Sequence, residues 1–218
     1  MSTPEQFLDA ARAGDLDLLR TMLGENPALM QSRNELDQSA ILLAMYHRKP
    51  EAAALLLASG VELNLHEAAA VGAFQRVKDL VAERGRLIDA HSTDGFTPLS
   101  LSAFFGHLEV ATHLVNQGAN LNLAANNKMM VAPIHAAVAS RNAAIVELLV
   151  SAGVDVNQQQ RHGFTPLHAA AQNGDEEIVR LLLAHGARRD IRAASQQTAM
   201  DLAMLKGHAG VVALLETS

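Results

Sequence analysis

Ten histidines are the side chains of this 218-residue chain best suited to metal binding or acid–base catalysis. A neutral imidazole is the commonest metal ligand in proteins, and its pKa lies close to physiological pH. Metal-binding helices present paired histidines as H-x-x-x-H or H-x-x-E-H, and neither spacing occurs here. The histidine pattern therefore predicts no metal site, and no cofactor is expected.

The other groups that usually carry catalysis are absent or isolated. The chain has no cysteine, which excludes disulfides, thiolate zinc sites and a cysteine nucleophile. The segment LHEAAA is not an HExxH motif, and no G-x-S-x-G elbow or glycine-rich phosphate loop occurs. We predict that the protein is not an enzyme, although a catalytic set assembled from distant segments stays open as an alternative.

Composition indicates a helical protein with a core of small and medium side chains. Hydrophobic residues make up 49% of the chain and aromatic residues only 3%. No segment reaches the roughly 18 consecutive apolar residues of a membrane span, and the first residues do not resemble a signal peptide. We expect a cytoplasmic protein that does not contact membranes.

The charge distribution argues against nucleic acid as a partner. The formal net charge is −6, with 9 Lys and Arg against 15 Asp and Glu in residues 1–109 and 8 against 8 in residues 110–218. A nucleic-acid binder is expected to carry a basic stripe that releases counterions from phosphate groups. No such stripe is visible in the sequence.

Internal repetition organises the candidate residues. The string GFTPLSLSAFFGHLEVATHLVNQGANLN at 95–122 recurs as GFTPLHAAAQNGDEEIVRLLLAHGARRD at 163–190, and Thr165 lies 33 residues before the corresponding Thr198. A fixed period of this length is the signature of stacked supersecondary units. Thr97 and Thr165 are expected N-caps, each followed by a proline at the first helical position. Glycines after the second helices are expected left-handed C-caps, at positions 60, 85, 118, 153 and 186.

The recurring order T-P-L-H…G…L-L…G-A-D-V-N closely resembles the ankyrin repeat, over essentially the whole chain. The resemblance implies an all-α, single-domain ankyrin-repeat solenoid over residues 1–218, in which helix-turn-helix pairs with β-hairpin fingers are stacked and the terminal copies act as caps. It also implies that His66, His135 and His168 share the histidine position of the motif and make structural hydrogen bonds. The approximate repeats are 4–34, 35–64, 65–94, 95–127, 128–160, 161–193 and 194–218.

One interruption breaks the period. The corresponding positions Ser39 and Leu63 are only 24 residues apart, so the third copy begins as a helix with no finger before it. A deletion that the stack tolerates is one interpretation. The other is a notch or bend near residues 60–72 that divides the binding surface into two segments of different charge.

The resemblance implies that the protein binds a partner protein through finger tips and the concave face of the first helices, as a scaffold or inhibitor. The oligomeric state is open, and a monomer is preferred. A regulatory or accessory subunit of a separately encoded enzyme is the alternative, and a small-molecule-binding enzyme is disfavoured. Five of the seven aromatic residues map to the groove side, with Phe7 and Phe74 in the core, although Phe96 and Phe164 could instead pack between fingers. The predicted partner-binding residues are Tyr46, Thr93, Asp94, Phe96, Phe104, Phe105, Lys128, Met129, Arg161, His162, Phe164, Gln172 and Asn173.

Overall fold

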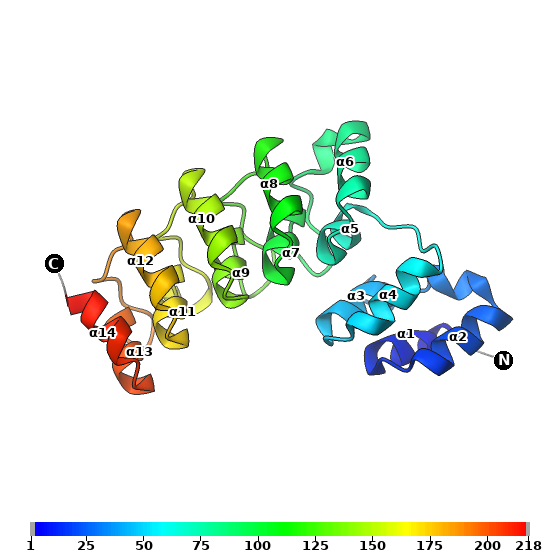
Figure 1. Cartoon of the computed structure of the whole chain (residues 1–218), viewed down its shortest axis with the longest axis horizontal. Helices are drawn as coiled ribbons and strands as arrows, with labels where there is room; N and C mark the ends of the chain where they lie inside the picture. Colours follow the sequence, from blue (N-terminus) through cyan, green and yellow to red (C-terminus); the bar gives the residue numbers. More distant parts are fainter. Residues whose placement is uncertain (1–2, 217–218) are drawn as a thin grey trace.

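The structure, a computed structural model, describes residues 3–216 as an elongated stack of fourteen α-helices (Figure 1). Each odd-numbered helix forms an antiparallel pair with the next even-numbered one, and the pairs are called pair 1 (α1–α2) to pair 7 (α13–α14). The helices are α1 (Pro4–Ala13), α2 (Leu16–Glu25), α3 (Ala40–Tyr46), α4 (Pro50–Ala58), α5 (Leu65–Val71), α6 (Phe74–Glu83), α7 (Pro98–Phe105), α8 (Leu108–Asn116), α9 (Pro133–Ala139), α10 (Ala143–Ser151), α11 (Pro166–Asn173), α12 (Glu176–Ala184), α13 (Ala199–Lys206) and α14 (Ala209–Glu216). Short 3-10 helices lie at η1 (Pro27–Gln31), η2 (Gly85–Leu87) and η3 (Arg161–Gly163).

The ends of the first helices form for the local reasons that the sequence suggests. The Thr97 and Thr165 side chains accept hydrogen bonds from backbone N–H groups of the first helical turn, which confirms both predicted N-caps. Gly174 ends α11 in the left-handed conformation, and a Cβ there would meet the His208 ring at 2.7 Å. The chain therefore needs glycine at this turn for both its conformation and its close packing.

The predicted left-handed cap at Gly85 is wrong. Gly60, Gly118, Gly153 and Gly186 have positive φ angles as expected, but Gly85 does not. It begins η2 instead: Gly60, Gly118, Gly153 and Gly186 are each followed by Ala or Val, whereas the exit from pair 3 continues from Gly85 as a 3-10 turn.

The core runs through the whole stack as one layer between helices. Alanines such as Ala68, Ala137 and Ala170 are fully buried in the first helices and allow neighbouring pairs to approach closely. The second helices supply larger buried side chains, such as Leu149 and Leu182. Stability is therefore built from the pairs and from the interfaces between neighbouring pairs.

The fingers are loops rather than the expected β-hairpins. Among residues 3–216 the structure has no strand, and a single isolated bridge joins Arg33 to Ser39. Each finger has too few residues to form a strand ladder. Each is closed by one backbone bond across its base, as from Gln160 N to Phe164 O, and by one turn bond, as from Gly163 N to Gln160 O. The loops before α9, α11 and α13 are also joined to the preceding loop by a backbone bond, as from Arg161 N to Met129 O. We call these loops finger 2 (residues 32–39), finger 4 (91–97), finger 5 (125–132), finger 6 (160–165) and finger 7 (193–198).

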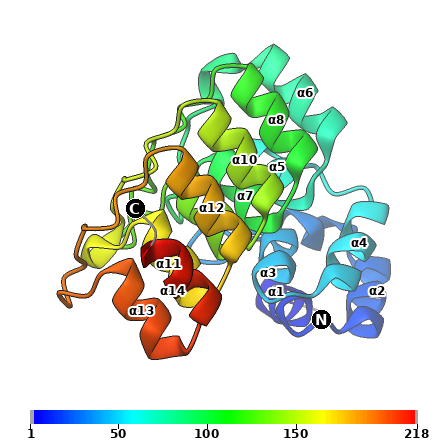
Figure 2. The ribbon, with the colours of Figure 1, turned by 60° about the vertical axis from the view of Figure 1, so that its left-hand side comes forward.

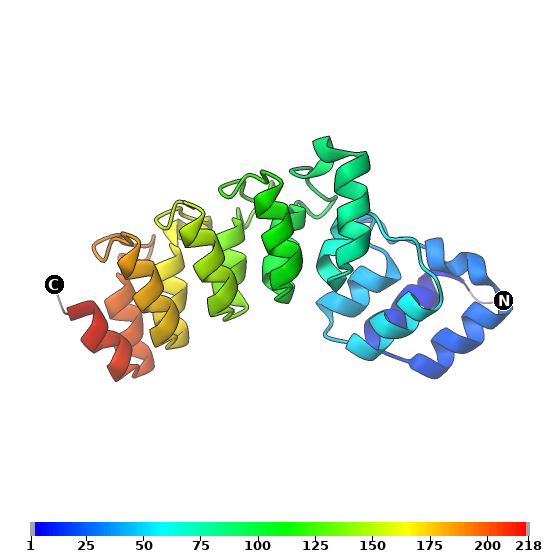
Figure 3. The ribbon, with the colours of Figure 1, turned by 45° about the horizontal axis from the view of Figure 1, so that its top comes forward.

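Pair 3 has no finger, and the stack bends there. Residues 59–64 connect α4 to α5 directly, and the N-caps Ser39 and Asn64 are 25 residues apart instead of the 33 between Thr165 and Thr198. Successive second helices pack against one another elsewhere, but α4 and α6 make at most a marginal contact. In Figures 1 and 3, α1–α4 are accordingly tilted away from the parallel row formed by the second helices from α6 onward.

Candidate functional site

The missing finger brings finger 2 directly onto finger 4. The Thr93 hydroxyl donates a hydrogen bond of 2.7 Å to the Leu36 carbonyl oxygen, although the two residues are 57 positions apart. Gln38 Nε2 donates to Asp94 at 3.2 Å, and the Tyr46 hydroxyl donates to the same carboxylate at 2.7 Å. Pairs 2 and 4 therefore touch across the concave side, with pair 3 outside this contact.

Asp94 is the centre of this contact. One of its oxygens accepts from Gln38 and Tyr46, and the other accepts from the Ser92 hydroxyl within the same finger. Burial and, after it, the hydrogen bond to Asp94 raise the pKa of Tyr46 well above its usual value. Tyr46 therefore remains a protonated donor throughout the physiological pH range, and the Asp94 carboxylate is already engaged on both oxygens.

Apolar and ionic contacts complete the junction, the name used here for the region where pairs 2, 3 and 4 meet. Leu42, Ala70 and Leu101, from α3, α5 and α7, form a small core cluster against which Tyr46, Phe96 and Phe105 pack. On the other side of finger 2, Arg33 Nη2 lies 3.0 Å from Glu67 Oε1, and the Glu67 side chain is only 1% exposed. The three pairs are therefore held together by side chains of several kinds.

A groove cavity of about 640 Å³ lies on the concave side of this junction. Its walls come from α3, α7 and α9 with fingers 2, 4 and 5, and finger 6 and α11 close its far end. Leu43, Tyr46, Phe104, Met129 and Val131 give it a largely apolar surface. Because α3 belongs to pair 2, the bend supplies one wall of the cavity.

Phe104 is the exposed aromatic side chain among the described residues that line the groove cavity. It is 43% exposed and stands edge-on against Phe105, with ring centroids 5.1 Å apart, while Phe105 packs against Tyr46 at 5.7 Å. A second cavity of about 630 Å³ adjoins the first and shares Tyr46 and Phe104 with it. It lies toward the helix turns, where Arg48, Lys49 and Arg141 line it.

The structure brings together some of the residues that the sequence singles out and leaves others apart. Tyr46, Asp94, Phe96, Phe104 and Met129 line the groove cavity, while Phe105 packs beside Phe104 and Thr93 fixes finger 2. Lys128, Arg161 and His162 are exposed at the tips of fingers 5 and 6, and Gln172 and Asn173 end α11, where their carbonyls accept bonds from His208 and Arg141. Phe164 is half-buried against the His168 ring at 5.3 Å, which favours the packing role left open for it.

Several lining residues escape the sequence reasoning. Gln38, Leu43 and Gln160 belong to the groove cavity but do not map to the groove from the sequence, whereas His47 maps there beside Tyr46 without being among the predicted contacts. Gln38 and Leu43 lie on finger 2 and α3, and their position opposite pair 4 depends on the missing finger. The shortened spacing between Ser39 and the third copy is the signal that could have identified them.

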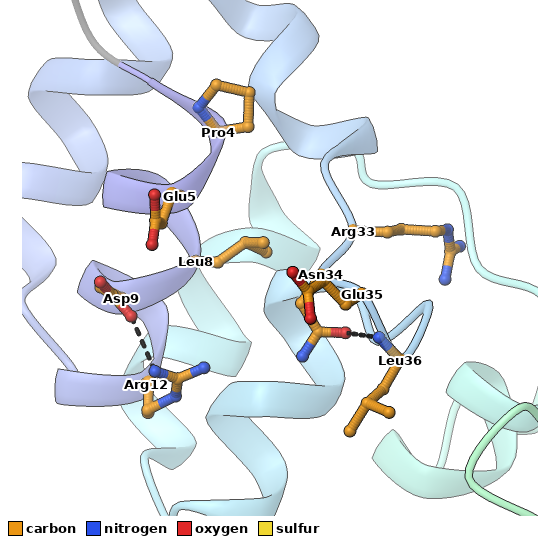
Figure 4. Close-up of a pocket in the computed structure, with 9 residues that line it drawn as sticks. All are labelled: Pro4, Glu5, Leu8, Asp9, Arg12, Arg33, Asn34, Glu35 and Leu36. Atoms are coloured by element: carbon orange, nitrogen blue, oxygen red, sulfur yellow. Dashed lines mark hydrogen bonds and ion pairs between the residues drawn. The ribbon is translucent and has the colours of Figure 1, made fainter.

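A different cavity lies on pairs 1 and 2. It has a volume of about 610 Å³ and is lined by residues of α1 and finger 2, including Glu5, Asp9 and Glu35 (Figure 4). Arg12 also lines it, but its guanidinium is paired with Asp9 at 2.7 Å. Arg33 lines it as well and is paired with Glu67, so this N-terminal cavity is more polar than the groove cavity and carries charges of both signs.

The buried histidines connect successive pairs. His135 Nε2 donates at 3.0 Å to Gln158 O, just before finger 6, and His168 Nε2 donates at 3.2 Å to Gln197 O in finger 7. His66 makes a similar bond of 2.8 Å to Ala90 O, which confirms its structural bond. Its predicted position is wrong by one residue, because Glu67 occupies the third helical position that His135 and His168 occupy.

Burial sets the protonation of these histidines. It lowers the pKa of His135 to about 4 and also lowers those of His66, His107 and His168. Neutral imidazoles that are bonded to backbone carbonyls serve to fix neighbouring pairs. Within residues 3–216, no group of three or more His, Asp or Glu side chains converges in a way that could hold a metal ion.

Stacked helix pairs that present a continuous concave face define a helical repeat protein. A family model described as ankyrin repeats (3 copies) matches residues 65–160 and 134–217, which together cover more than half of the chain. The chain therefore belongs to the ankyrin-repeat family.

Two curated proteins share stretches of sequence with the chain. It is 37% identical to Rabankyrin-5 of Homo sapiens over 78 residues, which are 35% of this chain and 6% of that protein. It is 31% identical to the inactive serine/threonine-protein kinase TEX14 of Mus musculus over 103 residues, which are 47% of this chain and 7% of that protein. The chain spans less than a tenth of the length of either relative.

The family gives a coarse account of function. Ankyrin repeats are generally protein-protein interaction modules and are typically non-catalytic. In the part of the chain that the structure describes, no helix is both long and apolar enough to cross a membrane.

Proposed function

We propose that the protein is a non-catalytic interaction protein that binds a partner protein in the groove cavity and along finger tips 4 to 6, as a scaffold or inhibitor and as a monomer. The observation that carries this proposal is the exposed Phe104 ring inside an apolar cavity of about 640 Å³. Contiguous exposed apolar surface on a soluble protein usually marks a contact site, and aromatic anchors supply much of the binding energy.

The groups of the groove cavity favour binding over catalysis. Asp94 is engaged by three hydrogen-bond donors, and His135 accepts from Ala132 N while it bonds to Gln158 O. A catalytic centre needs convergent titratable groups with free positions toward a substrate. These two side chains are instead used to hold the fold, as is the Tyr46 hydroxyl, while His47 is exposed at the end of α3.

The test is a crosslinked pull-down from the native host, with the captured proteins identified by mass spectrometry. Phe104→Ala is compared with the wild type and with Leu108→Ala, a matched control that is 42% exposed but lies on α8 of the same pair, outside the groove cavity. Phe105 is left unchanged because it packs against Tyr46.

We expect the wild type and Leu108→Ala to capture the same proteins and Phe104→Ala to lose at least one of them. Identical captured sets from all three proteins would reject the groove as the binding site. If a captured protein is an enzyme whose activity changes on addition of the chain, the chain acts as its regulatory subunit.

A further inference from the structure

We propose that the groove cavity accepts a bulky apolar side chain from a segment of the partner protein in which acidic residues flank that side chain. The inference rests on the proposed function and adds the chemistry of the partner. It is carried by the distribution of charge around the apolar walls.

Cations lie at both ends of the apolar surface. At the helix-turn end, Arg48 and Lys49 line the adjoining cavity beside Tyr46 and Phe104. At the finger end, Lys128 and Arg161 are exposed on the tips of fingers 5 and 6, next to the lining residues Met129 and Gln160. A segment that crosses from fingers to helix turns would meet positive charge before and after its apolar anchor.

Fewer carboxylates than cations border the apolar surface: exposed Asp37 adjoins the lining residue Gln38, and exposed Glu51 adjoins the lining residue Pro50. Asp94 is the acidic residue among the described residues that line the two cavities, and its oxygens are already bonded to Tyr46, Gln38 and Ser92. Arg141, also at the helix-turn end, is paired with Asp175. The net accessible charge around the groove is therefore positive, although the whole chain carries −6.

The apolar walls can accommodate partner side chains of different shapes. Phe104 and Met129 are 43% and 48% exposed, and they lie within one cavity with Leu43 and Val131. Methionine adapts its conformation to the group that it contacts, and an exposed aromatic ring provides a rigid surface. The anchor is thus expected to be a large apolar residue, with the acidic flanks setting its direction through electrostatic complementarity.

The N-terminal cavity provides an internal contrast. Glu5, Asp9 and Glu35 line it, and its Arg12 is paired with Asp9. Arg33 lines it too and is paired with Glu67, so among the described residues the carboxylates of Glu5 and Glu35 are left without a cation and an acidic segment gains no attraction there. The preference for acidic flanks therefore belongs to the groove cavity and not to the whole concave side.

The experiment uses three pools of short fluorescent peptides, measured by anisotropy against the full chain. All pools carry a central Phe, Leu or Trp, and the flanking residues are Asp and Glu, Lys and Arg, or Ser and Gln. We expect the acidic pool to bind tightest, with an affinity that falls as salt is added because exposed charges are screened.

Two charge-reversed variants locate the interaction. Lys128→Glu with Arg161→Glu reverses the finger end, and Arg180→Glu with Arg188→Glu is the matched control outside both cavities. Circular dichroism verifies that both are folded. We expect the first variant and Phe104→Ala each to weaken binding of the acidic pool about tenfold or more, and the control to leave it within about twofold.

Other outcomes separate this inference from the proposed function. Equal binding of the three pools, preference for the basic pool, or no binding of any pool overturns the acidic-flank inference. If neutral or basic peptides bind in a manner that depends on Phe104, the groove stands as a binding site. If acidic peptides bind but neither Phe104→Ala nor the finger variant weakens them, or if a single-stranded oligonucleotide displaces them, the attraction is nonspecific and the inference fails.

Discussion

Pairs 1–2 and pairs 3–7 differ in how their neighbours are joined. Within pairs 4–7, finger follows finger through a backbone hydrogen bond, and second helices pack in an unbroken row. Between pairs 2 and 3 the finger is absent, α4 and α6 separate, and side chains such as Arg33, Glu67, Tyr46 and Asp94 take over. Loss of one finger thus replaces a regular backbone register by a side-chain contact that determines the angle of the stack.

The two parts also present different surfaces. Figure 2, turned toward the C-terminal end, shows pairs 1 and 2 set apart from the tiers of pairs 4 to 7. The N-terminal cavity is lined by carboxylates and arginines together, while the groove cavity is apolar with cations at its ends. A tolerated deletion and a functional bend are therefore compatible, since the same missing residues create a wall of the groove.

The largest expected effect comes from cavities in the two parts of the core. Leu182 in α12 and Leu56 in α4 are both fully buried, and truncation of either to Ala is expected to cost about 2–5 kcal/mol of unfolding free energy. Because α4 and α6 lack the packing that joins the other successive second helices, each substitution should mainly destabilise the part that contains it. Leu56→Ala should affect pairs 1–2, and Leu182→Ala should affect pairs 3–7. Hydrogen exchange in low denaturant checks this, and equal loss of protection in both parts after Leu182→Ala would contradict it.

A fall in pH should destabilise pairs 3–7 more than pairs 1–2. The unfolded chain binds a proton at His135 near pH 6.5, but the folded chain does so only near its lowered pKa of about 4. The contribution of neutral His135 to the unfolding free energy is therefore complete above pH 6.5. It is lost as the pH falls toward 4, by about 3 kcal/mol. His66, His107 and His168 add to the loss in the same direction.

The measurement is chemical denaturation at several pH values for the wild type and for His135→Gln. The variant is expected to be less stable at pH 7 because its bonds to the next finger are altered, but to show a shallower decline below pH 6.5. A decline of unchanged slope would mean that His135 is not the group that titrates.

Removal of Asp94 should loosen the junction with a smaller effect on stability. Asp94→Ala leaves the half-buried Tyr46 hydroxyl and the Gln38 amide without their acceptor, at a cost of about 1–3 kcal/mol. The angle between pairs 2 and 3 should become variable, which small-angle scattering detects as a larger radius of gyration. Asp190→Ala, an exposed carboxylate outside the junction, is the control and should scatter like the wild type.

Tyr46→Phe should have the smallest effect. It removes one hydrogen bond to Asp94 but keeps the ring that packs against Phe105, so a loss of about 0.5–1.5 kcal/mol is expected. Denaturation midpoints check the size. A loss as large as that of Asp94→Ala would show that the hydroxyl alone holds the junction.

Local chemistry made the regular part of the fold predictable. Thr97 and Thr165 cap helices as expected, because capping depends only on a few adjacent residues. The slot of His66 was misplaced by one residue because Leu63 and Leu65 both fit the apolar pattern, and only the cap at Asn64 decides the register. The sequence also predicted the missing finger near residues 60–66.

The contact between pairs 2 and 4 that follows from the missing finger could not be predicted from the sequence pattern. Contact between Asp94 and Tyr46 depends on how far pair 2 tilts once the finger is absent, which is a property of packing over three pairs. The groove residues Gln38 and Leu43 follow from that tilt and were missed for the same reason. Phe104, in contrast, was identified because its place in the repeat sets which way it points.

The central claim is that finger 2 is the direct neighbour of finger 4. Because the chain has no cysteine, Leu36→Cys and Lys128→Cys place two spin labels on fingers 2 and 5 without competing sites. Successive pairs are about 10 Å apart, and finger 5 is two steps from finger 2 if finger 2 adjoins finger 4. Double electron–electron resonance should therefore give a narrow distance distribution near about 20 Å, which broadens in Asp94→Ala. A distribution near about 30 Å, as in a stack with an intervening finger, would contradict the account.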